Sequence, residues 1–422
     1  MVRLHLSKSR SGKVNLLVFG LYLIVFSLLL PLAACSHAPG NKLYDPRQVD
    51  FTVQYNPVFD RQLYPSLILA GLEDRDESQL FSISVVAPTD GCVLRVVIDS
   101  SDINYVTYLQ EVLPHRGETY TLFASTKWKY DVLRRLRQPH AVDLTFSCFI
   151  NDEEVDIKNI RLNCRTVNEC PLSFMHAGKT YDFRPLFAAY VNEDHPQIEQ
   201  ILTDIVDQGL ASRFSGYQNG PQSVDDQVFA VWQYVLRRGI TYSSISCTSN
   251  PSTTANVQHI RLFDEVWNTR QANCIDACVF FASILRKIGI RTVIFVEPCH
   301  AYLGYYSDKN RRHLVTLETT ITSWVNLPEL QRTLSDSGDS KQSADIDKVS
   351  RFLSPDELQR WNNGQMTLDQ LQTAVARSLF EKAKAYNTES YETNRQNFSD
   401  SSVIAYQQLD IEQLRKTVQP IR

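Results

Sequence analysis

Three residue types that together support nucleophilic catalysis occur in the second half of the chain at helix- and strand-sized spacings. Cys274 stands where a helical pattern begins, His300 opens an alternating run of residues, and Glu318 closes another such run. A thiol, an imidazole and a carboxylate can act as nucleophile, as base and as the group that orients the base. The sequence therefore predicts a cysteine-dependent active site.

The elements expected around these residues would bring them together. Asn273 is a suitable N-cap for a helix that starts at Cys274, and a helix N-terminus favours a thiolate. The 300 − 274 = 26 residues that follow leave room for the helix, a turn and a strand. The next 318 − 300 = 18 residues leave room for two antiparallel strands joined by the loop 307–312, which would set His300 beside Glu318.

Acyl transfer also needs donors for the oxyanion besides the amide of the nucleophile. Tyr242, in a segment before the cysteine, is one candidate, and Gln258 is the other. A packed core tyrosine is the alternative interpretation of Tyr242. Trp267 and Trp324 are candidates for the lining of a substrate groove, with a structural role in the core as the alternative.

These residues resemble the transglutaminase-like superfamily, most closely over 194–320. The resemblance is carried by four short motifs: Cys274-Ile-Asp276-Ala277, Leu285-Arg-Lys-Ile-Gly-Ile290, His300-Ala-Tyr302 and Leu317-Glu-Thr-Thr320. It implies a papain-related fold with Cys274 as nucleophile, His300 as base and Glu318 as orienting acid. The family contains peptidases, amidases and crosslinking enzymes. We expect hydrolysis of an amide through a thioester, with no cofactor and no metal.

Two departures from the family pattern leave alternatives open. The third position is usually Asp in the family, and thiols at Cys278 and Cys299 stand where small residues are common. One alternative is a catalytically inactive binding or scaffolding module. Another is a zinc site formed by Cys274, Cys278, Cys299 and His300, although adjacent strand residues point to opposite faces.

The N-terminus has the pattern of an export signal. A basic start precedes the apolar run 14–34, which ends in Leu32-Ala-Ala-Cys35 and resembles a bacterial lipobox. We expect removal of 1–35 up to a lipid-modified Cys35; an uncleaved transmembrane anchor is the alternative. Ser36 after the cysteine favours the periplasmic face of the outer membrane. A peptide or protein of the cell envelope is then the expected substrate.

The rest of the chain divides into a tether and two domains. Residues 36–47 are polar and contain prolines, which is typical of a tether. The segment 48–170 contains short period-2 runs, which predict an all-β, immunoglobulin-like sandwich. The segment 176–422 is predicted as an α+β transglutaminase-like domain with its core at 194–320. The runs expected as strands in the first domain are 51–55, 67–70, 81–86, 92–98, 120–123 and 142–150, with a helical stretch at 127–137.

Charge and cysteine content narrow the function classes further. The 422 residues carry a net charge of −4, so no basic surface for nucleic acid is expected, and oligomeric state is not indicated. Nine cysteines in an exported protein permit disulfides. Cys92–Cys148 and Cys164–Cys170 are the pairs we expect, and Cys278 with Cys299 is an alternative brace. Cys247 has no assigned partner, since sequence alone does not fix connectivity.

Overall fold

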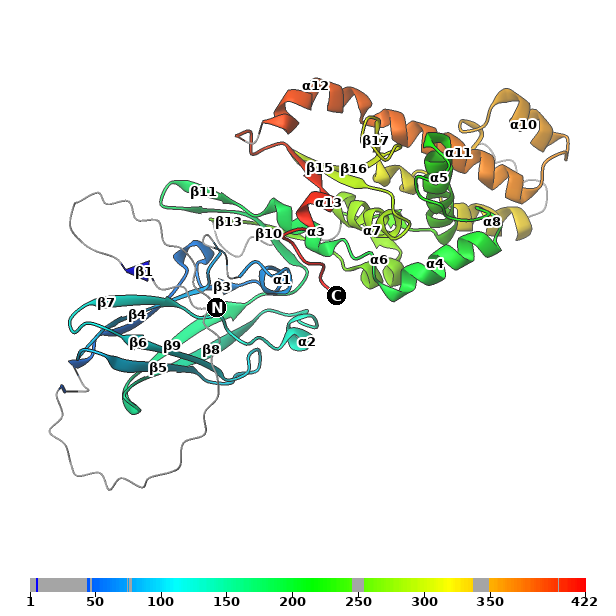
Figure 1. Cartoon of the computed structure of the whole chain (residues 1–422). Helices are drawn as coiled ribbons and strands as arrows, with labels where there is room; N and C mark the ends of the chain where they lie inside the picture. Colours follow the sequence, from blue (N-terminus) through cyan, green and yellow to red (C-terminus); the bar gives the residue numbers. More distant parts are fainter. Residues whose placement is uncertain are drawn as a thin grey trace. The chain divides into compact units, whose positions relative to one another are not determined.

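The structure, a computed structural model, describes residues 5–6, 44–45, 48–73, 75, 78–244, 254–336, 349–400 and 402–422. The apolar run of the leader, Cys35 and Cys247 lie outside these residues. Within the described ranges, no helix combines the length and apolar character needed to cross a bilayer. The chain is a mixed α/β protein with several sheets and two compact units (Figure 1).

The first unit comprises 1–56 with 79–129 and 142–162, and its described residues form mainly strands. One of its sheets has the order β1-β7-β4-β2, and the other contains β9-β8-β5-β6. Phe81 of the first sheet and Phe146 of the second meet with ring centroids 5.3 Å apart. The strands are β1 (His5–Leu6), β2 (Phe51–Tyr55), β4 (Phe81–Val86), β5 (Cys92–Ile98), β6 (Thr107–Leu113), β7 (Thr119–Phe123), β8 (His140–Ile150) and β9 (Glu153–Cys164).

Burial along β5 alternates residue by residue, as a strand with one face on the core requires. Several of the strands predicted for 48–170 are present, and the immunoglobulin-like sandwich stays a prediction. One predicted strand was wrong: 67–70 lies in helix α1 (Pro65–Leu69), because Pro65 occupies the first helical turn. The helix predicted at 127–137 is shorter in the structure, where α2 spans only Tyr130–Leu133.

The two expected disulfides of this region are absent. Cys92, Cys148 and Cys170 carry free thiols. On the paired strands β5 and β8, Cys148 lies opposite Val96 and not opposite Cys92. Four residues of strand correspond to about 13 Å, whereas a disulfide needs Cα atoms within about 7 Å. Burial raises the pKa of Cys148 to about 12 and that of Cys170 well above its ordinary value, so both thiols stay protonated and inert.

The second unit, 57–78 with 130–141 and 163–422, contains the predicted catalytic residues. Its strands are β3 (Gln62–Leu63), β10 (Glu169–His176), β11 (Lys179–Asp182), β12 (Thr241–Tyr242), β13 (Ala255–His259), β14 (Gln271–Ala272), β15 (Thr292–Glu297), β16 (His300–Tyr306), β17 (Leu314–Leu317) and β18 (Gln407–Asp410). Its longer helices are α4 (Pro196–Asp207), α5 (Pro221–Arg238), α6 (Phe263–Thr269), α7 (Cys274–Lys287), α8 (Leu327–Asp336), α10 (Pro355–Asn362), α11 (Leu368–Tyr386) and α12 (Thr388–Ser399). Its shorter helical segments are α1 and α2, together with η2 (Pro57–Phe59), η3 (Arg184–Leu186), α3 (Phe187–Tyr190), η4 (Thr319–Ser323) and α13 (Ile411–Leu414).

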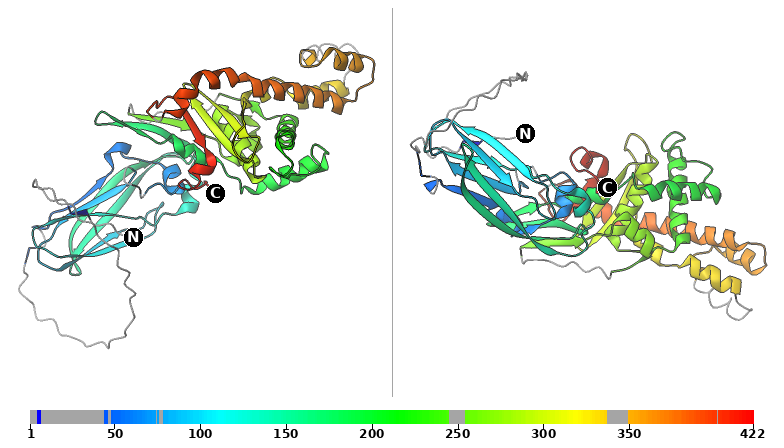
Figure 2. Two further views of the ribbon diagram at one scale, coloured as in Figure 1. Left: turned by 45° about the horizontal axis from the view of Figure 1, so that its top comes forward. Right: turned by 90° about the horizontal axis from the view of Figure 1, so that it is seen from below.

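An antiparallel sheet of order β17-β16-β15-β18 forms the centre of this unit. Helix α7 packs against β15 and β16, while α11 and α12 contact β17 and β18 from the other side (Figures 1 and 2). Val293, Phe295 and Tyr302 pack with Phe398 of α12 in an apolar cluster. Full burial of one such aromatic side chain stabilises the fold by roughly 1.5–3 kcal/mol. This core holds in place the end of the sheet at which β16 begins with His300.

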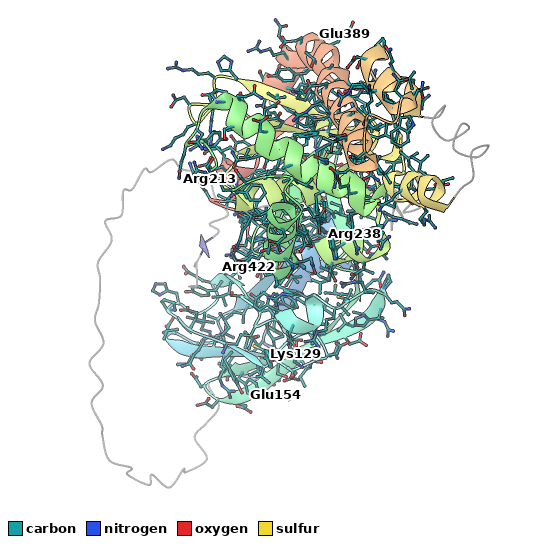
Figure 3. All side chains as sticks on the ribbon, turned by 90° about the vertical axis from the view of Figure 1, so that its right-hand side faces the viewer. Lys129, Glu154, Arg213, Arg238, Glu389 and Arg422 are labelled. Carbon is teal, nitrogen blue, oxygen red and sulfur yellow. The ribbon has the colours of Figure 1, made fainter. Side chains whose placement is uncertain are left out.

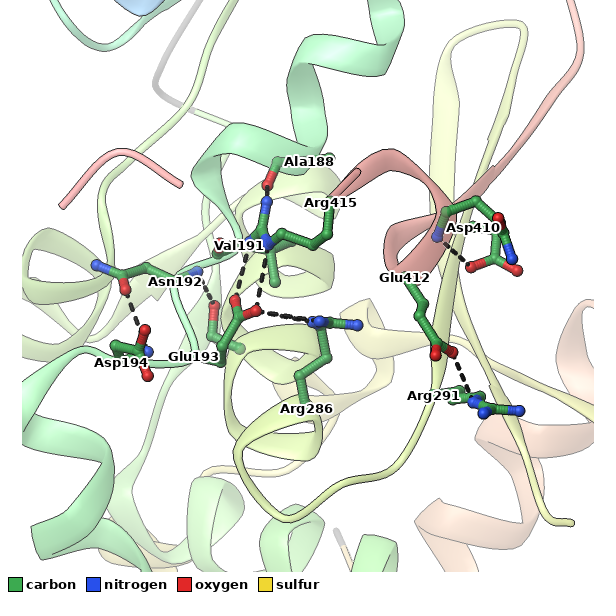
Figure 4. A network of polar contacts seen from close by, with 12 residues as sticks. Ala188, Val191, Asn192, Glu193, Asp194, Arg286, Arg291, Asp410, Glu412 and Arg415 are labelled. Carbon is green, nitrogen blue, oxygen red and sulfur yellow. Dashed lines mark hydrogen bonds and ion pairs between the residues drawn. The ribbon is translucent and has the colours of Figure 1, made fainter. Parts of the chain in front are cut away.

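Polar contacts hold the C-terminal end of α7 (Figure 4). Arg286, in the last turn of the helix, pairs with Glu193 over 3.1 Å, and Arg415 of the C-terminal segment pairs with the same carboxylate over 2.9 Å. Burial raises the pKa of Glu193, but the hydrogen bonds and charges of the two arginines outweigh it and leave a pKa of about 2. Exposed side chains of both signs, such as Arg213 and Glu389, lie elsewhere on this unit (Figure 3).

Candidate active site

Cys274 occupies the first position of helix α7 and is half-buried. Its N-cap is Asn273, as expected: Asn273 Oδ1 accepts from the amide of Asp276 over 2.8 Å, and the Asp276 carboxylate accepts from the amide of Asn273 over 3.0 Å. These two bonds form a capping box that fixes the helix start. The amide of Cys274 itself points out of the first turn, where no helix carbonyl can accept from it.

Asp276 is fully buried and ties the helix start to the segment before it. Its carboxylate accepts from the backbone amide of Arg261 over 2.8 Å and from the Arg261 guanidinium over 2.7 Å. Burial raises the pKa of Asp276, and the bonds from Asn273 and Arg261 oppose that effect. Three donors, the Asn273 amide and the amide and guanidinium of Arg261, thus hold the Asp276 carboxylate. Because Asp276 is two residues after Cys274, the backbone that carries the Cys274 sulfur is held in place.

His300 lies between Cys274 and Glu318. Its Nε2 donates to Glu318 Oε2 over 2.7 Å, and its imidazole also interacts with the Cys274 side chain. The bond to Cys274 and then the bond to Glu318 raise the pKa of His300 to about 10, against the opposing effect of burial. The imidazolium is therefore the stable form of His300 at neutral pH, paired with the Glu318 carboxylate.

Glu318 is 1% exposed, and both of its oxygens are saturated. Oε1 accepts from the amide of Thr320 over 3.0 Å and from the Thr320 hydroxyl over 2.6 Å. Oε2 accepts from His300 and from Asn387 Nδ2, each over 2.7 Å. Burial raises the pKa of Glu318, but its bonds and charge interaction with His300, together with those from Thr320 and Asn387, leave it below its ordinary value.

Asn387 was not identified from the sequence. It is 3% exposed and lies at the junction of α11 and α12, 69 residues after Glu318. A position between two helical patterns signals a cap, which is the ordinary role of asparagine. The sequence does not indicate that the Asn387 amide donates to Glu318, because that contact depends on how α11 packs against the sheet.

Of the two oxyanion candidates, Tyr242 lies near the triad and Gln258 is engaged elsewhere. Tyr242 pairs with Ala272 on the parallel strands β12 and β14, two residues before Cys274, and it is 44% exposed. Burial, then the charges of Cys274 and Glu318, raise the pKa of Tyr242, so its hydroxyl stays a hydrogen-bond donor. Gln258 lies on β13, and its amide donates to the backbone carbonyl of His259 over 2.9 Å.

The two tryptophans occupy different surroundings. Trp267 stacks on Tyr234 with a 7° angle between the rings, and the Arg238 guanidinium covers it at 4.4 Å. This packing is structural. Trp324 follows η4 and is 44% exposed, and it meets the exposed Tyr386 with ring centroids 6.2 Å apart. Trp324 is therefore a surface aromatic at the C-cap of η4, the helix whose N-cap is Glu318.

The additional thiols form neither a brace nor a metal site. Cys278 is fully buried and Cys299 is exposed, and both are free thiols. The Cys278 sulfur lies 3.8 Å from the Thr319 hydroxyl, and burial raises the pKa of Cys278 well above its ordinary value. In the described part of the chain, no three His, Cys, Asp or Glu side chains gather closely enough to hold a metal ion.

The arrangement as a whole matches what acyl transfer by a thiol requires. A sulfur on a fixed helix start hydrogen-bonds to a protonated imidazole, and a buried, saturated carboxylate sets the orientation of that imidazole. The Tyr242 hydroxyl is a further donor near the cysteine, since Tyr242 pairs with Ala272 on the strand that leads into α7. None of these groups needs a bound ion to carry out the chemistry.

No protein-family model and no curated protein sequence matches the chain. Among solved structures, one similar chain is that of red sea bream transglutaminase, with 8% sequence identity and a TM-score of 0.19. The match covers 69% of this chain and 57% of that chain, so less than two thirds of the fish enzyme has a counterpart here. A likeness this low carries no argument about function, which therefore rests on the geometry of Cys274, His300 and Glu318.

Proposed function

We propose that this protein is a cysteine peptidase or amidase of transglutaminase-like type, with Cys274 as nucleophile, His300 as acid and base, and Glu318 as the group that orients His300. The observation that carries the proposal is the position of His300, whose Nε2 lies 2.7 Å from the buried Glu318 carboxylate and whose imidazole also interacts with the side chain of Cys274. If His300 served only in packing, we would not expect it to lie beside a half-buried thiol at a helix N-terminus, which is a setting typical of reactive cysteines.

In the first half of the reaction, the Cys274 thiolate attacks the carbonyl carbon of an amide. A carbon–sulfur bond forms, and the carbonyl oxygen becomes an oxyanion that accepts from the Cys274 amide and the Tyr242 hydroxyl. The His300 imidazolium then gives its proton to the leaving nitrogen as the carbon–nitrogen bond breaks. A thioester on Cys274 and a free amine remain, and His300 is neutral.

In the second half, neutral His300 takes a proton from water, and the resulting hydroxide equivalent attacks the thioester. The carbon–sulfur bond breaks, the sulfur leaves as thiolate, and His300 is again an imidazolium. The thiolate–imidazolium pair is thereby restored. Glu318 remains ionised throughout and keeps the ring of His300 in place.

The cellular setting of the proposal comes from the leader sequence. A lipid on Cys35 would tether the protein to the bacterial envelope, at the periplasmic face of the outer membrane, with 36–47 as spacer. Envelope peptides or proteins are then the accessible substrates. Export and retention on the membrane are tested by fractionating cells that express the full chain beside a Cys35→Ala variant, which should lose the membrane association.

The catalytic proposal is tested by trapping the thioester. The protein is incubated with an ester of the same acyl chemistry, 4-nitrophenyl acetate, and its intact mass is followed over time. We expect acetylation that maps to Cys274, release of the acyl group by water, and neither event in Cys274→Ala. Acetylation that is equally fast in Cys274→Ala would overturn the assignment of the nucleophile.

A further inference from the structure

A half-buried carboxylate lies beside His300 on the neighbouring strand. Glu297 is the register partner of His300 in the antiparallel pair β15–β16. Directly opposed residues in such a pair point to the same face of the sheet, with their Cβ atoms about 4.5–5.5 Å apart. Glu318 lies toward the other neighbour, β17, so His300 has one carboxylate on each side.

The two carboxylates differ in what neutralises them. Glu318 is buried and paired with the His300 imidazolium. Glu297 accepts one hydrogen bond, from the Ser390 hydroxyl of α12 over 3.1 Å, and no lysine or arginine of the described residues pairs with it. Its charge also acts on its surroundings, since Glu297 contributes to the raised pKa of Tyr302. A carboxylate with no cation of its own thus flanks the catalytic base.

The proposed reaction determines which part of a substrate meets this carboxylate. His300 must hand its proton to the leaving amine, so the amine nitrogen has to lie within hydrogen-bond distance of the imidazole. The groups attached to that nitrogen are then the ones that lie along the residues flanking His300. The acyl part, in contrast, lies toward Cys274 and the oxyanion donors.

We propose that Glu297 recognises a cationic group on the amine side of the substrate, distinct from the reacting nitrogen, such as the side-chain ammonium of a basic residue. This inference rests on the proposed function and refines it by naming a substrate class. At a separation of about 6–8 Å and an effective dielectric constant of about 40, such a charge pair corresponds to a preference of roughly 5–10-fold. The preference should weaken as salt is raised.

A structural role for Glu297 makes a different prediction. If the carboxylate serves only to tie α12 to β15 through Ser390, then losing the hydrogen bond matters and losing the charge does not. Glu297→Gln removes the charge and keeps an oxygen that can accept from Ser390. Ser390→Ala removes the bond and keeps the charge, and Glu389→Gln makes the same change in net charge at an exposed neighbouring position.

The experiment uses acyl exchange, because an accepting amine occupies the same place as a leaving amine. Cys274 is acetylated with 4-nitrophenyl acetate, and the acetyl group is transferred to 1,5-diaminopentane or to the neutral analogue 5-amino-1-pentanol. The attacking nitrogen forms a bond to the acetyl carbon and passes its proton to His300, and the Cys274 sulfur leaves as thiolate. The measured quantity is the ratio of the two transfer rates, each divided by the number of primary amino groups in the acceptor.

We expect a ratio of roughly 5–10 in the wild type, a ratio near 1 in Glu297→Gln, and an unchanged ratio in Ser390→Ala and Glu389→Gln. A wild-type ratio near 1, or a preference that survives in Glu297→Gln, would overturn this inference while acetylation of Cys274 still supports the proposed function. Absence of Cys274 acetylation in the wild type would overturn both.

Discussion

A carboxylate with a lowered pKa lies near each end of helix α7, but the partners of the two carboxylates differ. Near its N-terminus, Glu318 binds His300, which in turn hydrogen-bonds to Cys274. At its C-terminus, Glu193 binds Arg286 and Arg415. Arginine remains charged throughout the accessible pH range and has no proton to give, whereas histidine can exchange one. A carboxylate with a lowered pKa therefore pairs with permanently charged arginines at one end of the helix and with a histidine, which can exchange a proton, at the other.

The largest expected effect is at the sulfur of the N-terminal end. Cys274→Ala should lower turnover by at least about 10³-fold, because no other group in the arrangement can form the thioester. The melting temperature should change little, since the residue is half-buried and alanine is a good helix former. Steady-state turnover and thermal unfolding of the same preparation check both statements. Turnover above about a tenth of the wild-type rate would show that the nucleophile is elsewhere.

Removal of the charge that supports His300 should have the next largest effect. Glu318→Gln is expected to lower kcat by roughly 10²–10⁴-fold, because the imidazolium loses its buried partner and the ring loses its fixed orientation. The pKa of His300, raised to about 10 in the wild type, should fall toward its ordinary value. The pH dependence of kcat/KM measures this change. An unchanged profile would assign the third catalytic position to another residue.

A smaller loss is expected at Asn387, which acts through Glu318. Asn387→Ala removes one charge-assisted bond of 2.7 Å and should lower kcat by roughly 10–100-fold, with little change in KM. Asn387→Gln does not restore the geometry, whereas Asn387→Ser retains a donor and should recover part of the rate. A purely structural role for Asn387 would lower stability and leave the pH profile of kcat in place.

The difference between these residues also explains what the sequence could reveal. The spacing of Cys274, His300 and Glu318 is set by consecutive elements, a helix and a hairpin, so local patterns were sufficient to predict their proximity. Asn387 comes from a helix junction whose position depends on long-range packing. The strand expected at 67–70 failed for a local reason, since a short apolar run does not distinguish a strand from a buried helix that starts at Pro65.

The expected disulfides failed for a related reason. Cys92 and Cys148 lie on neighbouring strands, as expected, but the register that separates them is fixed by the pairing of β5 with β8 and is not encoded in their spacing. Among the oxyanion candidates, Tyr242 lies near Cys274 because β12 pairs with the strand that leads into α7. Gln258 belongs to the sheet β11-β10-β13, which sequence proximity to the cysteine did not reveal.

Substitutions at the C-terminal end of α7 should change the free energy of unfolding and leave kcat unchanged. Glu193→Gln is expected to reduce the free energy of unfolding by on the order of 2 kcal/mol, after allowance for solvent screening. Glu199→Gln is the matched control, because Glu199 pairs with Lys287 in the same turn but is 73% exposed. It should cost less than about 0.5 kcal/mol. Denaturant unfolding compares the two, and kcat of each folded variant should equal that of the wild type.

The smallest expected effect is the pH dependence of the difference in unfolding free energy between the wild type and Glu193→Gln. The folded-state pKa of Glu193, about 2, is lower than its ordinary value of 4.5. Its contribution is therefore fully present above about pH 4.5 and is lost as the pH falls toward 2. The gap in unfolding free energy between wild type and Glu193→Gln should narrow across this window. A gap that stays constant down to pH 2 would assign the stability to packing and not to the charge.

The most direct test of the account is the reactivity of Cys274 toward iodoacetamide across pH, followed by mass spectrometry of the labelled peptide, in wild type and in His300→Ala. The exposed Cys299 in the same molecule is an internal reference. We expect Cys274 to be labelled at a pH far below that at which Cys299 reacts, and His300→Ala to remove the difference. If Cys274 follows the profile of Cys299 in the wild type, or if His300→Ala leaves its profile unchanged, there is no thiolate–imidazolium pair and the catalytic assignment is wrong.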